Sequence, residues 1–96
     1  MKIRFLKSAA SDITWMRRYY KSVFPEGSQT AGKNYHAARL AILANPGIGH
    51  SVEHIKDARA YSIPKTPFSF IYRVKDDVIE VVRVLDSRSE DSNDFS

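Results

Sequence analysis

Two stretches in the second half of the chain constrain its fold most strongly, because both have the composition and alternation of β-strands. Residues 68–74 read FSFIYRV and residues 78–85 read VIEVVRVL, and the second stretch is rich enough in β-branched residues to suit a central strand buried on both faces. Asp76-Asp77 favours a tight turn between them. The sequence therefore predicts a β-hairpin, with three aromatic side chains on one face of its first strand: Phe68, Phe70 and Tyr72.

The first half of the chain has the periodicity of two amphipathic helices, with apolar residues spaced by three and four. We expect the first helix to be capped by Ser8 or Ser11 and to end at about Phe24, just before a proline and a glycine. The second should cover residues 28–44 and stop at Asn45-Pro46-Gly47. Because their connection is short, the two helices should pack as an antiparallel hairpin.

Two further short strands complete the expected fold, at residues 2–6 and 59–63, while residues 46–56 have no clear period and read as a loop. The order is then strand, helix, helix and three strands. This order predicts an α+β fold in which the helical hairpin packs on one face of a small, mostly antiparallel sheet and leaves the other face largely to solvent or a ligand. A chain of 96 residues has room for a single domain, residues 1–96.

The charge is unevenly distributed along the chain. Residues 86–96 hold four acids against Arg88, and we expect this acidic tail to be flexible. Since the whole chain has a net charge of +4 and the tail one of −3, the preceding 85 residues carry +7 and should attract an acidic partner, either nucleic acid or protein. The absence of cysteine, of a secretion signal and of an apolar run of roughly 20 residues favours a cytoplasmic protein outside the membrane.

Three motifs resemble those of the ParE/RelE superfamily of bacterial toxins. They are the helix stop LANPGIG at residues 43–49, ARAY at residues 58–61, and the hairpin at residues 68–74 and 78–85. The resemblance implies the α+β fold described above and an antitoxin that wraps the toxin and holds it inactive. It also implies one of two activities, because ParE-like members block DNA gyrase whereas RelE-like members cut messenger RNA on the ribosome.

The end of the final strand favours the first activity. Ribonucleases of the superfamily resemble one another in having a His or Tyr there, whereas this chain has Asp86 and no His or Tyr beyond it. An ionised aspartate is a poor proton donor. We therefore predict a ParE-like gyrase poison that acts by binding, has no catalytic residues and no cofactor, and assembles with a ParD-like antitoxin. Two alternatives stay open: a ribosome-dependent ribonuclease, and a degenerate member that retains only antitoxin binding.

Candidate binding residues fall into two groups. Three aromatic residues on the helices are predicted antitoxin anchors, although aromatics at helical spacing also serve as core: Trp15, Tyr19 and Tyr35. Four arginines are predicted to form a basic target-binding patch: Arg59, Arg73, Arg83 and Arg88. In the alternative ribonuclease, Arg59, Arg73 and Arg83 would surround the scissile phosphate. A blander interpretation is that Arg73 and Arg83 lie with Glu80 on a solvated surface. No metal site is expected from the three histidines, which are His36, His50 and His54.

Overall fold

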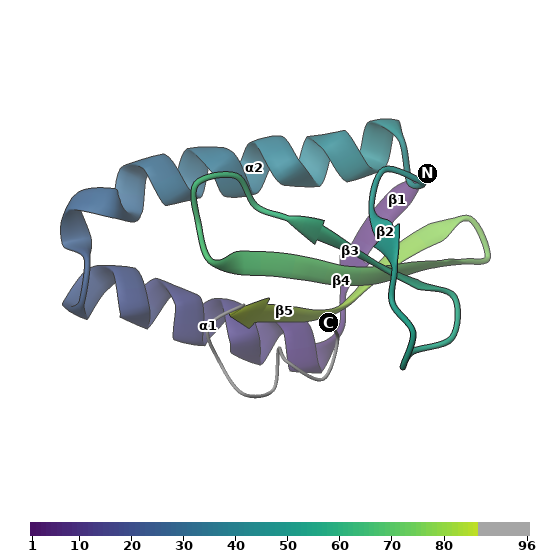
Figure 1. The fold of residues 1–96 in the computed structure, drawn as a ribbon, viewed down its shortest axis with the longest axis horizontal. Helices are drawn as coiled ribbons and strands as arrows, with labels where there is room; N and C mark the ends of the chain where they lie inside the picture. The colour runs from purple at the N-terminus through teal and green to yellow at the C-terminus, as the bar shows by residue number, and fades with distance from the viewer. Residues whose placement is uncertain (87–96) are drawn as a thin grey trace.

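A computed structural model describes residues 1–86 of the chain. Its helices and strands follow the predicted order, with one additional short strand and a 3₁₀ turn. In chain order they are β1 (Lys2–Phe5), α1 (Lys7–Ser22), η1 (Pro25–Gly27), α2 (Ser28–Ala44), β2 (His50–Ser51), β3 (Ala58–Ser62), β4 (Phe68–Lys75) and β5 (Val78–Asp86). Figure 1 shows α1 and α2 as two long antiparallel helices joined at one end, which confirms the predicted helical hairpin.

The five strands form one sheet in the order β1-β5-β4-β3-β2. Neighbouring strands are antiparallel except for β1, which pairs in parallel with the first half of β5. The predicted turn joins β4 to β5, and both of its residues have positive φ, 51° at Asp76 and 64° at Asp77, as a type I′ hairpin requires. The first half of β5 is a central strand, as predicted, because it lies between β1 and β4, whereas β1 does not extend along the second half.

The face of the sheet that meets the helices holds the main core. The aromatic residues of β4 predicted to share a face are all buried there, packed against both helices and β5. The opposite face is less open than expected at one end. Ile71 and Leu85 form a second buried cluster with two alanines of β3, and Val52 and Ile55 of the preceding loop cover it.

The loop predicted at residues 46–56 is more ordered than its sequence suggested. It contains β2, which pairs with β3, and it is fastened to β4 by the hydroxyl of Tyr72. This hydroxyl donates to the carbonyl oxygen of Pro46 at 2.8 Å and accepts from the amide of Gly49 at 3.0 Å. A Cβ atom at Gly49 would lie 2.7 Å from the carbonyl oxygen of Ala60, so only glycine allows this close approach.

The predicted serine cap of the first helix is wrong. Leu6 occupies the N-cap position and provides no side-chain hydrogen bond. The hydroxyl of Ser8 instead donates to the carbonyl oxygen of Val82, at 2.6 Å. The reason is that Leu6 alone connects β1 to α1, which places the first turn of the helix directly beside β5. The helix also ends at Ser22, two residues before the predicted Phe24.

Candidate partner-binding site

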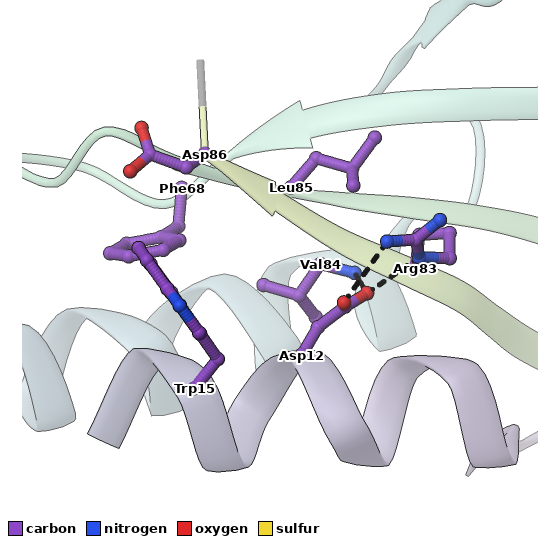
Figure 2. Close-up of a pocket in the computed structure, with 7 residues that line it drawn as sticks. All are labelled: Asp12, Trp15, Phe68, Arg83, Val84, Leu85 and Asp86. Carbon is purple, nitrogen blue, oxygen red and sulfur yellow. Dashed lines mark hydrogen bonds and ion pairs between the residues drawn. The ribbon is translucent and has the colours of Figure 1, made fainter. Parts of the chain in front are cut away.

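A groove runs between α1 and the second half of β5. It encloses about 260 Å³, and its walls come from α1, from the start of β4 and from the end of β5. Figure 2 shows Asp12 and Trp15 rising from the helix toward the strand, with Phe68 beside the indole. The groove thus brings together a predicted antitoxin anchor, Trp15, and a member of the predicted basic patch, Arg83.

The groove exists because β1 is short. β1 pairs with β5 only as far as Val81, and among the described residues no strand continues along the outer edge of β5. Val82 is an extra residue on β5 relative to β4, which adds a local irregularity at this point. Helix α1 therefore borders Val82–Asp86 where a strand would otherwise lie.

Asp12 supplies a hydrogen-bond partner that the missing strand would have provided. Its carboxylate accepts from the backbone amide of Val84 at 2.8 Å and, at the same time, from two nitrogens of Arg83, at 2.8 Å from Nε and 3.1 Å from Nη2. The buried amide is thereby satisfied, and the charge of Arg83 is balanced within the chain. Helix and strand are clamped together at the floor of the groove (Figure 2).

Trp15 is the most prominent apolar side chain of this groove, because 50% of its surface is exposed. Its ring stacks on Tyr19, with centroids 5.9 Å apart, and meets Phe68 edge-on at 5.8 Å. These contacts hold the indole in one orientation while one part of it stays open to solvent. A rigid, half-exposed tryptophan beside a groove is typical of an anchor for a partner.

Tyr35 lies apart from the other two predicted anchors. It packs on Phe5 and Phe70 and lines a different groove, between α1 and α2. Burial raises the pKa of its phenol, against the opposing effect of the charges of Arg39 and Arg17. The structure therefore joins Trp15 and Tyr19 into one aromatic surface and places Tyr35 in another.

The predicted arginines are also divided. Arg59 pairs with Tyr72 across β3 and β4 and so lies on the helix side of the sheet, where it donates to the carbonyl oxygen of Gly49 at 2.7 Å. Arg73 pairs with Ala58 and lies on the opposite face. Arg83 is held by Asp12, as described above, and Arg88 lies outside the described residues.

The sequence placed Glu80 beside Arg73 across the hairpin, but it did not indicate Arg4 as a further partner of Glu80 or Asp12 as the partner of Arg83. Glu80 accepts hydrogen bonds from Arg4 and from Arg73, and these bonds, that of Arg4 first, lower the pKa of its carboxyl despite its burial. The Glu80–Arg73 pair follows from the two-residue turn of the hairpin. Arg4 could not be placed beside Glu80, because the parallel pairing of β1 with β5 leaves no local signal in the sequence.

Within residues 1–86, no three or more His, Cys, Asp or Glu side chains are grouped so as to hold a metal ion. None of the helices described there is long and apolar enough to cross a membrane.

Comparison with known proteins identifies the family. The fold is that of a small α+β protein similar to a solved structure entitled "Chromosomal ParDE TA system from P. aeruginosa", with a TM-score of 0.70 and 24% identity over 88% of this chain and 92% of that chain. A family model described as the ParE toxin of type II toxin-antitoxin system, parDE, matches residues 3–91. The chain therefore belongs to the ParE toxin family, which confirms the predicted superfamily. No curated protein sequence matches it.

Proposed function

We propose that this protein is a toxin that poisons DNA gyrase by binding to it and that a ParD-like antitoxin neutralises the toxin. The observation that carries the proposal is the half-exposed Trp15 at the groove between α1 and β5, in a chain of the ParE toxin family. The same proposal places the protein in the cytoplasm, where gyrase acts.

The antitoxin would occupy the groove beside Trp15. Burying the exposed half of a tryptophan removes roughly 100 Å² of apolar surface from water, which is worth roughly 2.5 kcal/mol at about 25 cal/mol per Å². Because Ser8 and Asp12 of α1 already bond the backbone of Val82 and Val84 on this edge, the antitoxin segment would pack its side chains into the groove without adding a strand to β5. Tyr19 stacks on the indole of Trp15. Tyr35 would contact the antitoxin only if the antitoxin also reaches the groove between α1 and α2.

The engagement of the arginines favours binding over catalysis. Cutting RNA requires cations aimed at the scissile phosphate and an acid for the leaving oxygen. Arg83 is engaged by Asp12, and Arg59 donates to a backbone carbonyl on the other side of the sheet from Arg73. The residue at the end of β5, where the related ribonucleases have a His or Tyr, is Asp86.

Two assays run side by side test the proposal. Purified, antitoxin-free protein is added to a gyrase supercoiling and cleavage reaction and to a translation reaction probed for cut messenger RNA. We expect gyrase to be inhibited and the message to stay intact. Cut message with active gyrase would instead establish the ribonuclease, and no effect in either reaction would indicate a degenerate member that retains only antitoxin binding.

A further inference from the structure

The open face of the sheet carries a row of three charged residues on adjacent strands. Arg4 of β1 lies opposite Glu80 of β5, which lies opposite Arg73 of β4. The two carboxylate oxygens of Glu80 are divided between the arginines, Oε2 accepting from Nη2 of Arg4 at 2.5 Å and Oε1 from Nε of Arg73 at 2.9 Å. Glu80 thus holds two guanidinium groups side by side.

The carboxylate is buried whereas the arginines are not. The side chain of Glu80 is 7% exposed, compared with 64% for Arg4 and 37% for Arg73. Each arginine uses one nitrogen for Glu80, and its remaining N–H donors have no partner among residues 1–86. These donors can meet an anion in the paired arrangement that suits a phosphate group. Two positive charges on one negative charge leave the row with a net charge of +1.

Two lysines extend the basic surface on the same face. Lys2 and Lys75 both lie opposite Val78, in the row next to the arginines, and both are exposed. The acids nearest in sequence, Asp76 and Asp77, stand in the turn beyond the ends of β4 and β5. On the paired strands themselves, four basic residues therefore surround one buried carboxylate.

The same face has no aromatic side chain on β1, β4 or β5. Every aromatic residue of these strands belongs to the core on the helix side, namely Phe5, Phe68, Phe70 and Tyr72. A ligand on the open face therefore has no ring on which to stack a base, which disfavours the usual mode of single-strand binding. The donors that remain are suited to the sugar-phosphate backbone.

We propose that Arg4 and Arg73, organised by Glu80 and flanked by Lys2 and Lys75, bind the phosphate backbone of double-stranded DNA without reading its sequence. Neighbouring strands lie about 4.8 Å apart and alternate residues about 6.8 Å apart, so the four cations span roughly 10 by 7 Å. A surface of this size neutralises about three phosphates, and binding should then weaken about 40-fold between about 50 and about 200 mM salt.

The test is fluorescence anisotropy with the full chain and a labelled DNA duplex of roughly 20 base pairs, long enough to offer several phosphates. The variant Arg4→Gln/Arg73→Gln should bind at least about tenfold more weakly than the wild type. The matched control Arg18→Gln/Lys21→Gln removes two exposed charges from α1 and should change the affinity less than about twofold.

A second variant guards against a folding defect, since the arginine variant leaves Glu80 buried without its partners. Lys2→Gln/Lys75→Gln keeps the row of Arg4, Glu80 and Arg73 intact and should still weaken binding several-fold and lower the salt dependence. Equal losses in the α1 control, or no binding by the wild type at low salt, would overturn the proposal. So would displacement of the duplex by a polyglutamate peptide of equal charge, which would mean that the face takes acidic protein. The assay contains no gyrase, so its outcome is separate from that of the proposed function.

Discussion

The two halves of β5 have different neighbours and, as a result, different uses. Val78–Val81 lies between β1 and β4; within it Ile79 and Val81 are buried in the core, and Glu80 organises the arginine row. Val82–Asp86 has β4 on one side only, and on its other side the helix α1 supplies Ser8 and Asp12 as substitutes for a strand. The comparison shows that a helix covers a sheet edge less completely than a strand does. Side chains of α1 reach the backbone of β5 only at certain positions, and a groove remains beside them.

The largest expected effect is on stability, and it contrasts a buried residue of the first half with the half-buried residue at which the second half begins. Ile79→Ala removes a fully buried side chain from the first half and should lower the free energy of unfolding by about 2–5 kcal/mol. Val82→Ala acts on a half-buried side chain at the irregularity of the second half and should cost less than about 1 kcal/mol. Urea unfolding of both variants checks this. Similar losses would mean that the side chain of Val82 is packed as tightly as that of Ile79.

The next effect concerns antitoxin binding at the second half. Trp15→Ala should weaken affinity for the antitoxin by about 2 kcal/mol or more, roughly 30-fold. It should also lower the stability of the toxin by about 1–3 kcal/mol, because the buried half of the indole packs on Tyr19 and Phe68. Calorimetric titration measures the affinity. Val23→Ala, at a side chain that is 66% exposed, is the matched control and should have little effect. Equal affinity of the Trp15 variant and the wild type would place the antitoxin elsewhere.

The clamp between α1 and β5 should have an intermediate effect on stability. Asp12→Ala leaves the amide of Val84 without its acceptor and Arg83 without its carboxylate, and should destabilise the protein by about 1–3 kcal/mol. Asp12→Asn retains one acceptor oxygen and should restore part of the loss. Thermal or urea unfolding of the pair measures the difference, and a full loss in the Asn variant would show that the charge alone matters.

The smallest effect is the pH dependence contributed by the first half. The pKa of Glu80 is lowered in the folded state by its hydrogen bonds to Arg4 and then Arg73, so its contribution to stability is present above the ordinary pKa of 4.5 and is lost as pH falls below that value. The gap in unfolding midpoint between the wild type and Glu80→Gln should therefore narrow as pH falls from 7 through this range. A gap that stays constant with pH would contradict the assigned role of the two arginines.

Local patterns were sufficient to predict most of the fold. The second helix was predicted with its observed bounds, and the strand residues of the hairpin followed from their alternation and from the two aspartates of the turn. That turn also fixes Arg73 opposite Glu80, because a two-residue connection sets the register. These features depend on residues close together in the sequence.

The features that the sequence did not predict depend on contacts between distant residues. The parallel pairing of β1 with β5 brings Arg4 to Glu80, and the early end of that pairing brings Asp12 to Val84. The periodicity within each segment does not predict these contacts between distant residues. The same reason explains why Arg59 and Arg73 were predicted to share one patch, since their assignment to opposite faces requires the register of β3 against β4.

The most direct test of the central claim is a gyrase supercoiling assay in which antitoxin is titrated against the wild type and against Trp15→Ala. If the groove beside the second half of β5 holds the antitoxin and the toxin acts on gyrase from another surface, both proteins inhibit gyrase, and rescue from Trp15→Ala requires roughly 30-fold more antitoxin than rescue from the wild type. Loss of inhibition by the variant itself, or equal rescue from both proteins, would contradict the account.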